Sequence, residues 1–326
     1  MQDWNSYIFS EVSFEEKAMA VFEYQRQHNE VYGRFCQALG VEPDHTFDIP
    51  LLPIQAFKEA QITMQPDPDP EIIFQSSGTS GMNRSKHLVA DTNLYRKSIL
   101  NGFNQFYDLD QSVILAYTPG YADNPHSSLI WMLNELIAQD DIGLSRFLSL
   151  DKPLEQATVE EIEASGRRLI LFGAAFGLLD LAESSTVSLP NNSTVIETGG
   201  MKTHRREMSR EEMHHILADG FDLANDRIHS EYGMAELLSQ AYATGGKWFR
   251  SVPWMKVTIR DPDDPMKQLP PFYEGLIGVV DLANVHSCPF ILTGDKGVMD
   301  KKDRFQVLGR WNPKDLRGCN FLIDED

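Results

Sequence analysis

The chain has 326 residues, of which 42% are hydrophobic and 24% are charged. This composition is typical of a folded globular protein and excludes a largely disordered or collagen-like chain. Its 48 acidic residues outnumber 29 basic ones, which gives a formal net charge of −19 at pH 7. Such a surface repels a phosphate backbone, so we expect no nucleic acid partner.

The length predicts roughly two domains or one large α/β unit. The most apolar stretch, 169–179, is 11 residues long, and a bilayer-spanning helix needs about 20, so no membrane span is expected. Residues 1–13 lack the order of a secretory signal, which favours a cytoplasmic protein. Cys36, Cys288 and Cys319 form no CxxC pair, so a functional cysteine would act singly, as a thiol.

Capping residues and hydrophobic periodicity predict the first elements. Ser13 and Glu16 have the spacing of a capping box, and a helical stripe continues until Gly40, so one helix is expected there. Five prolines between residues 50 and 70 then predict turns and short pieces of chain.

Strands and helices alternate from residue 71 to about residue 230. The expected strands are 71–75, 112–117, 169–172, 194–197 and 226–230. The expected helices are 91–107, 127–138 and 176–182, one capped by Thr158 and Glu161, and one capped by Ser209 and Glu212. This alternation predicts an α/β fold with mostly parallel sheets flanked by helices.

Beyond residue 244 the pattern changes to short strand-like segments. They are 248–252, 256–260, 276–282, 289–292 and 304–308. We therefore expect an α/β core at 1–243, a β-rich subdomain of the same unit at 244–310, and a hinge-like C-terminal segment at 311–326.

Six small residues follow the strand expected at 71–75. They are Ser76, Ser77, Gly78, Thr79, Ser80 and Gly81. Glycines and successive backbone N–H groups can wrap a phosphate. Lys86 lies just beyond, without the GxxxxGK[ST] spacing of the Walker loop, which argues against a P-loop NTPase. An ordinary Ser/Gly hairpin turn is the alternative interpretation.

Two further segments place an acid beside a flexible turn. In the segment 230–236 a strand ends at a glycine, and the carboxylate of Glu236 can hold Mg²⁺. A solvated glutamate at a helix N-terminus is the alternative. In the segment 293–295 a strand delivers Asp295, which can accept hydrogen bonds from both hydroxyls of a ribose; a common Gly-Asp turn is the alternative.

In their order and spacing these motifs resemble the AMP-forming adenylate enzymes, the superfamily of acyl-CoA synthetases and firefly luciferase. The chain is most similar to the LuxE-type acyl-protein synthetases, the ATP-using component of fatty acid reductase systems. The resemblance covers 49–58, 74–81, 117–133, 197–212, 230–240, 293–295 and 309–319. It implies the fold of the adenylate-forming N-terminal domain. The small C-terminal domain that carries a catalytic lysine in larger members is expected to be absent, because the sequence stops at Asp326.

The resemblance also implies residue roles. The segment 76–81 would hold the phosphates of ATP and Glu236 the magnesium ion, Asp295 would bind the ribose, and Arg310 would reach the nucleotide from the hinge. Thr198, Gly199 and Gly200 would form the adenine-side wall, and Tyr232 and Gly233 would line the nucleotide site. The candidate cations that would neutralise developing charge are Lys86, Lys202, Arg205 and Arg310; each has a solvated surface charge as its alternative.

Two single residues complete the expected site. His126 resembles the acyl-pocket gate of the superfamily, with a surface histidine near a helix cap as the alternative. LuxE-type synthetases pass the acyl group to a cysteine near their own C-terminus, and Cys319 is the late cysteine here. Arg317 and Lys314 would lower the pKa of its thiol; a small, half-buried hydrophobic residue is the alternative. Cys288 is expected to be buried and inert.

The expected protein is an AMP-forming acid–thiol ligase that uses ATP and Mg²⁺. It would convert a fatty or aryl carboxylic acid into its acyl-adenylate and pass the acyl group to a protein thiol, either Cys319 or a thiol of an acceptor such as a reductase or carrier protein. Two alternatives stay open. One is an acyltransferase that takes the acyl group from a pre-activated thioester. The other is a non-catalytic nucleotide- or acyl-binding subunit of a fatty acid reductase or synthase complex.

Overall fold

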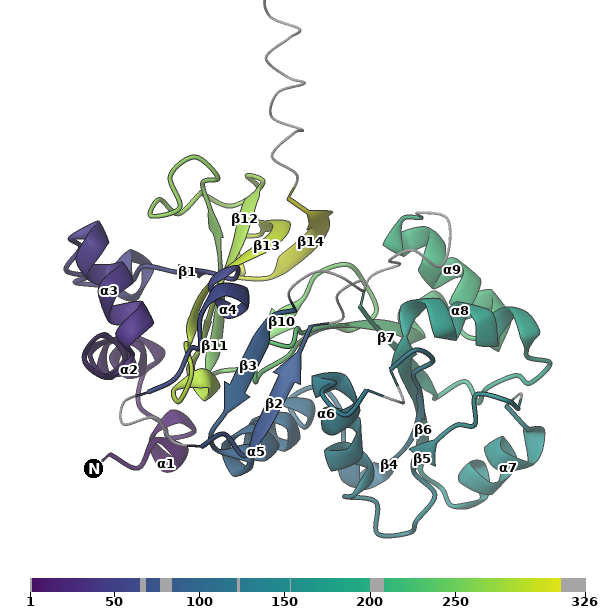
Figure 1. Ribbon diagram of the computed structural model, residues 1–326. Helices are drawn as coiled ribbons and strands as arrows, with labels where there is room; N and C mark the ends of the chain where they lie inside the picture. The colour runs from purple at the N-terminus through teal and green to yellow at the C-terminus, as the bar shows by residue number, and fades with distance from the viewer. Residues whose placement is uncertain are drawn as a thin grey trace, which may run out of the picture.

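The computed structural model describes residues 2–64, 69–76, 84–121, 124–152, 154–199 and 208–311, and all elements and contacts below belong to these residues. Within them lie a seven-stranded sheet, a five-stranded sheet and a two-stranded hairpin (Figure 1). None of the helices in this part of the chain combines the length and the hydropathy that a bilayer span requires.

The seven-stranded sheet has the strand order β10-β9-β8-β7-β6-β4-β5. Its bounds are β4 Ser112–Tyr117, β5 Arg146–Phe147, β6 Arg168–Ala174, β7 Thr194–Thr198, β8 Ile228–Tyr232, β9 Ala241–Ala243 and β10 Arg250–Ser251. The strands from β5 to β8 run parallel, and β9 and β10 add an antiparallel edge. The mostly parallel sheet predicted from the alternating pattern is confirmed.

Alternate residues of the parallel strands face two different helix layers, as a side-chain period of two requires. Ile114 and Ile170 belong to the core that includes residues of α5 and α6, whereas Val113 and Leu171 pack with residues of α7, α8 and α9. The bounds of these helices are α5 Thr92–Phe103, α6 Ser128–Ile137, α7 Gln156–Ala164, α8 Ala175–Ser184 and α9 Arg210–Phe221. Figure 1 shows α7, α8 and α9 together on one side of the sheet.

The five-stranded sheet has the order β1-β13-β12-β11, with β14 on the other side of β13. Its bounds are β1 Leu52–Pro53, β11 Met255–Arg260, β12 Gly275–Asp281, β13 Phe290–Met299 and β14 Phe305–Arg310. The last four strands pair antiparallel, and β1 pairs parallel with β13. A strand from the first part of the chain therefore completes the β-rich sheet, while β10 belongs to the larger sheet.

The N-terminal helices cover the five-stranded sheet. The ring centroids of Phe22 and Tyr32 lie 6.2 and 5.4 Å from that of Phe290 on β13. The helices are α1 Trp4–Ile8, α2 Phe14–His28, α3 Glu30–Leu39 and α4 Ala56–Glu59. The short 3₁₀ segments are η1 Thr46–Asp48, η2 Leu109–Gln111, η3 Asn225–Arg227 and η4 Leu282–Asn284.

The strand expected at 71–75 belongs to neither large sheet. It is β2 (Ile72–Gln75), which pairs antiparallel with β3 (Lys86–Val89). The pairing continues past the strand ends, because the N–H of Ser76 donates to the carbonyl of Ser85 at 3.3 Å and the N–H of Ser85 donates to Oγ of Ser76 at 3.2 Å. The small-residue segment therefore connects the two strands of a hairpin.

Three other expectations were wrong in detail. The helix expected at 13–40 is two helices, because Asn29 ends α2 and its side chain caps α3 by accepting from the N–H of Tyr32. Thr158 does not cap α7, which begins two residues earlier; its hydroxyl accepts a hydrogen bond from Arg146 at 3.1 Å. The strand expected to end at residue 292 continues through Met299, because β14 pairs with its second half.

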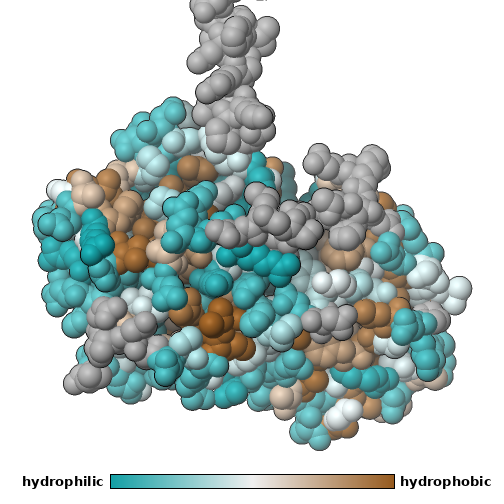
Figure 2. All heavy atoms as spheres, in the orientation of Figure 1, coloured by the Kyte–Doolittle hydropathy of each residue, from teal (hydrophilic) through white to brown (hydrophobic). Residues whose placement is uncertain are grey.

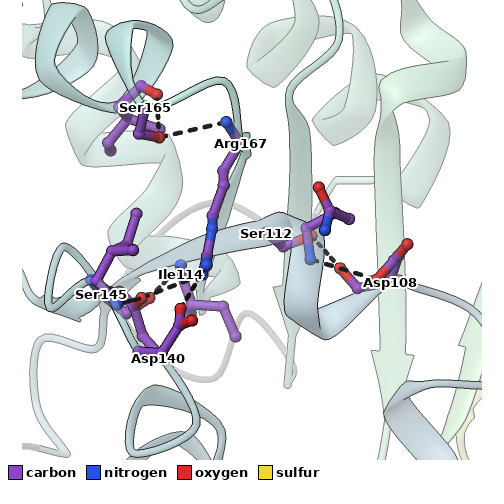
Figure 3. A network of polar contacts seen from close by, with 11 residues as sticks. Asp108, Ser112, Ile114, Asp140, Ser145, Ser165 and Arg167 are labelled. Atoms are coloured by element: carbon purple, nitrogen blue, oxygen red, sulfur yellow. Dashed lines mark hydrogen bonds and ion pairs between the residues drawn. The ribbon is translucent and has the colours of Figure 1, made fainter.

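A polar network fixes the amino ends of the parallel strands (Figure 3). The Ser112 hydroxyl donates to the carbonyl of Asp108 at 2.6 Å, and the Ser145 hydroxyl accepts from the N–H of Ile114 at 2.9 Å. Arg167 pairs with Asp140 at 3.3 Å. These contacts tie β4, the turn before β5 and the start of β6 together.

The face of the molecule in Figure 2 is largely hydrophilic, with apolar residues in separate patches.

Candidate active site

The carboxyl ends of neighbouring parallel strands bring several expected site residues together. Thr198 ends β7 and Tyr232 ends β8, and Thr198 is in register with Glu231 of β8. Gly199 follows with φ of 81°, a conformation that glycine adopts without strain. Ligands of open α/β sheets bind outside this edge, which makes it the candidate active site.

Asp295 joins this edge from the other sheet. It lies within β13, and its Oδ2 accepts a hydrogen bond from the hydroxyl of Tyr232 at 3.0 Å. Its Oδ1 pairs with Nε of Arg310 at 3.1 Å, because the two residues are in register on β13 and β14. Asp295 is 7% exposed. The carboxylate is therefore held by two donors and keeps lone pairs for further hydroxyl groups.

Glu236 lies four residues beyond Tyr232 and is 5% exposed. Burial raises the pKa of its carboxyl group, and the Ser85 hydroxyl and the charges of Arg310 and Lys58 act in the opposite direction. Arg310 thus acts electrostatically on Glu236 while it pairs with Asp295. Tyr232, Glu236, Asp295 and Arg310, which the motifs singled out separately, converge at one place.

The base of the hairpin lies at the same place. Ser76 and Ser85 close its base, and Ser85 is the residue beside Glu236. Lys86 is exposed at the start of β3, in register with Gln75. The other expected residues of this loop, Ser77, Gly78, Thr79, Ser80 and Gly81, lie outside the described residues, as do Gly200, Lys202, Arg205, Lys314, Arg317 and Cys319.

His126 is half-buried and bonded to β2. Its Nδ1 lies 2.9 Å from the carbonyl oxygen of Ile73, so Nδ1 carries the proton, and its own carbonyl accepts from the N–H of Gln75 at 3.0 Å. The histidine is thereby fixed next to Ser76, with Nε2 left as an acceptor. It is part of the hairpin edge and not a freely solvated surface residue.

Sequence reasoning missed several residues of this edge. Tyr121 is one: a Cβ atom on Gly199 would lie 3.8 Å from its hydroxyl, and its ring faces Phe176 at 6.5 Å. Ser85 is another, and its position just before Lys86 gave no signal of burial.

Cys36 and Cys288 are both buried, and burial raises the pKa of the Cys288 thiol to about 12. The expectation that Cys288 is buried is confirmed.

Glu231 was also missed, although it precedes Tyr232. It is 7% exposed and has no cationic partner among the described residues, and burial raises the pKa of its carboxyl group to about 7. Its only strong donor in that part of the chain is the hydroxyl of Thr198. Glu197, one strand away, differs because His214 and Arg210 lie 3.5 and 3.2 Å from its carboxylate. The effect of burial on its pKa is outweighed by hydrogen bonding to His214 and by the charge of Arg210, so the pKa is lowered.

The fold is that of adenylate-forming enzymes. A crystal structure of 2-hydroxyisobutyryl-CoA ligase matches over 90% of this chain and 68% of that chain, with 12% identity and a TM-score of 0.62. MatB from Rhodopseudomonas palustris, with ATP bound, matches over 73% of this chain with 16% identity and a TM-score of 0.52, and the match spans about half of MatB, 47%. A luciferase-like enzyme from the mealworm Zophobas morio is 19% identical over 74% of this chain and 58% of that chain, with a TM-score of 0.51.

The sequence comparisons are more specific. The family model described as "Acyl-protein synthetase, LuxE" matches residues 5–99 and 147–326. A long-chain-fatty-acid–luciferin-component ligase of Vibrio harveyi is 24% identical over 93% of this chain and 85% of its own length. The ligase of the same name from Aliivibrio fischeri is 22% identical over 95% of this chain and 89% of its own length.

The chain belongs to the LuxE acyl-protein synthetase family, as its motifs predicted. It is an AMP-forming acid ligase, which activates a carboxylic acid with ATP and transfers the acyl group to a protein. Membership of this family does not support the two alternative functions, an acyltransferase that uses a pre-activated thioester and a non-catalytic binding subunit.

Proposed function

We propose that the chain activates a long-chain fatty acid with Mg·ATP at the edge where Tyr232, Glu236, Asp295 and Arg310 converge. The observation that carries this proposal is the pair of contacts of Asp295, with Tyr232 at 3.0 Å and Arg310 at 3.1 Å, beside the buried Glu236. The substrate class follows the names of the two curated relatives, both of which are long-chain-fatty-acid ligases.

The residues present fit a magnesium ion. Glu236 offers a buried carboxylate that has no ion pair among the described residues, and the hydroxyl of Ser85 lies beside it. Hard oxygen donors of this kind suit Mg²⁺, which is usually held by one or two carboxylates together with substrate phosphates. When bound, the ion would neutralise charge that develops on the phosphate oxygens.

The nucleotide would be held by groups from both sheets. Asp295 accepts from the ribose hydroxyls with the lone pairs that Tyr232 and Arg310 leave open. Thr198 and Gly199 give the adenine a flat backbone wall flanked by Tyr121. Gly233 follows Tyr232 without a side chain that would fill the space, and a Cβ there would approach Oε1 of Glu231 to 2.3 Å.

In the first step an oxygen of the fatty acid carboxylate forms a bond to the α-phosphorus of ATP. The bond from that phosphorus to the bridging oxygen breaks, and pyrophosphate leaves with the electron pair. Both reactants are anionic, so the chain must supply positive charge at fixed positions. Arg310 and Lys86 supply it here, and His126 stands at the end of the hairpin where it limits the access of water.

In the second step a thiolate forms a bond to the acyl carbon, and AMP leaves with the electron pair of the broken carbon–oxygen bond. We assign this thiol to Cys319, because Cys36 and Cys288 are buried and burial raises the pKa of both thiols. A raised pKa lowers the thiolate fraction that a nucleophile needs. The acyl group would then pass to an acceptor protein, a reductase or a carrier protein.

Pyrophosphate–ATP exchange tests the proposal directly. The wild-type chain should catalyse exchange that depends on a long-chain fatty acid and on Mg²⁺, and Glu236→Gln should abolish it. Glu160→Gln, on an exposed position of α7, is the matched control and should exchange at the wild-type rate. Protein labelling from an acyl thioester without any exchange would instead identify the acyltransferase alternative.

A further inference from the structure

A hollow lies at the amino ends of the parallel strands, at the edge of the seven-stranded sheet opposite the candidate active site. This amino-end hollow has a volume of about 180 Å³, many times the space that one water molecule needs. The residues that line it are Tyr107, Ser112, Arg168, Thr194, Arg227 and His229, among others. The proposed function uses none of them.

The strand residues of the amino-end hollow point to one face of the sheet. Ser112 is in register with Arg168, and Thr194 is in register with Ile170, two residues beyond Arg168. Because side chains alternate along a strand, all four lie on the same face. Ile170 joins the core that includes α5. The residues just after α5, which ends at Phe103, also line the hollow, so it lies where that helix ends.

Two arginines of the amino-end hollow have no ionic partner. Arg168 and Arg227 are exposed, and neither makes an ion pair or a side-chain hydrogen bond with any residue that the structure describes. By contrast, Arg167 pairs with Asp140 at 3.3 Å. Only β7 lies between β6 and β8, so Arg168 and Arg227 are about 10 Å apart across the sheet. Two unpaired positive charges at that spacing attract an anion between them.

The other charges near the amino-end hollow add to this attraction. The guanidinium of Arg250, on β10, lies 5.4 Å from the ring centroid of Phe106, which also lines the hollow. Asp108 contributes a carboxylate to the described lining, but its Oδ1 accepts from the N–H of Gln111 at 3.3 Å and caps η2. Positive charge therefore outweighs negative charge around the hollow, on a chain whose net charge is −19.

Hydrogen bonds hold the wall of the amino-end hollow in place. Nε2 of His229 donates to the carbonyl of Asp226 at 3.2 Å, and Nδ1 accepts from the hydroxyl of Tyr107 at 3.1 Å. Burial lowers the pKa of His229 to about 4, so the ring is neutral and both of its nitrogens are occupied. The hydroxyl of Ser112 donates to the carbonyl of Asp108 at 2.6 Å (Figure 3). The wall is thus fixed before any ligand enters.

We propose that the amino-end hollow binds a small molecule that carries a phosphate group, with Arg168 and Arg227 as the binding residues. Guanidinium groups donate paired N–H bonds to phosphate oxygens, and a phosphate has enough oxygens to accept from both arginines. Thr194 begins β7 between them, and its hydroxyl can donate to a further oxygen. A carboxylate has only two oxygens to share. The volume of the hollow leaves room for an organic group beside the phosphate. This inference does not depend on the proposed function.

Isothermal titration calorimetry with phenyl phosphate, inorganic phosphate and benzoate tests the inference. The wild-type chain should bind both phosphates more tightly than benzoate, which keeps the ring of phenyl phosphate but carries a carboxylate. Arg168→Gln and Arg227→Gln should each raise the dissociation constant for phenyl phosphate by roughly tenfold or more, the effect of losing hydrogen bonds to a charged group. Arg34→Gln is the matched control, because it removes the same charge from an exposed arginine of α3 that pairs with Glu30, and it should bind as wild type does.

Three results would overturn the inference. They are a wild-type chain that binds neither phosphate, arginine variants that bind phenyl phosphate as wild type does, and benzoate binding as tight as that of phenyl phosphate. The second result would place the phosphate elsewhere, for example at the candidate active site. Pyrophosphate–ATP exchange should be unchanged in Arg168→Gln, because the hollow lies at the opposite edge of the sheet. Thermal unfolding checks that each variant is folded, as expected for substitutions of exposed side chains.

Discussion

The hydroxyl of Tyr232 donates a hydrogen bond of 3.0 Å to Oδ2 of Asp295, and this contact joins the seven-stranded sheet to the five-stranded sheet. Aromatic packing supports it, because the ring centroid of Tyr232 lies 5.4 Å from that of Phe305 on β14 and 6.1 Å from that of Phe249. The orientation of Asp295, which we expect to bind the ribose, therefore depends on how the two sheets meet.

Tyr232→Phe tests this relationship. Removing the hydroxyl leaves Asp295 with one fewer donor, so we expect the KM for ATP to rise about tenfold and the free energy of unfolding to fall by about 1–2 kcal/mol. Steady-state kinetics and denaturant unfolding measure the two effects. Tyr107→Phe is the control: it removes a tyrosine hydroxyl bonded to His229 at 3.1 Å, and it should cost stability without changing the KM for ATP. Equal KM values for both variants would contradict a role for Tyr232 at the nucleotide.

Cysteine substitution separates the two chemical steps. Cys319→Ala should leave pyrophosphate exchange unchanged and abolish the protein thioester formed with a labelled fatty acid, because only the second step needs a thiol. Cys288→Ala is the control and should still be labelled, since that thiol is buried and has a pKa of about 12. A labelled thioester on the Cys319→Ala chain would show that the acyl group goes to another residue.

Glu231 makes stability depend on pH. Its pKa is raised from 4.5 to about 7 in the folded chain, so between these values the folded state binds more protons than the unfolded state. The contribution of Glu231 to the free energy of unfolding is therefore fully present below pH 4.5 and is lost as the pH rises through 7. Glu231→Gln removes the titration and should gain up to about 3 kcal/mol relative to wild type between pH 5 and pH 8.

Urea unfolding of the wild-type chain and of Glu231→Gln at both pH values measures that difference. Glu160→Gln, an exposed position, serves as the control and should show no pH-dependent difference from wild type. A Glu231→Gln curve that stays parallel to wild type across this range would mean that the carboxyl group titrates normally.

Close packing positions the segment before His126. A Cβ atom on Gly177 would approach Cγ of Pro119 to 2.4 Å, far inside van der Waals contact. We expect Gly177→Ala to displace this segment, to lower stability by about 1–3 kcal/mol and to raise the KM for the fatty acid more than the KM for ATP. Gly246→Ala is the control, because a Cβ there meets nothing within 4 Å. If both KM values are unchanged in Gly177→Ala, the segment before His126 does not contribute to binding of the fatty acid.

Local sequence patterns determined much of this protein. The Ser209 cap, the end of the helical stripe at Gly40 and the alternation of strands with helices are all present as predicted. They follow from capping geometry and side-chain periodicity, which act over a few residues. The order of the motifs was sufficient to identify the family, because each motif is a short continuous segment.

Only the tertiary structure decided which of these segments meet. Tyr232 and Asp295 are 63 residues apart in sequence, and nothing in either motif specifies the hydrogen bond between them. The pairing of β1 with β13, the hairpin partner of β2 and the burial of Ser85 and Glu231 were likewise absent from the local pattern. Such contacts arise from the packing of whole sheets and helices, where the burial of distant apolar faces fixes the polar groups at their edges.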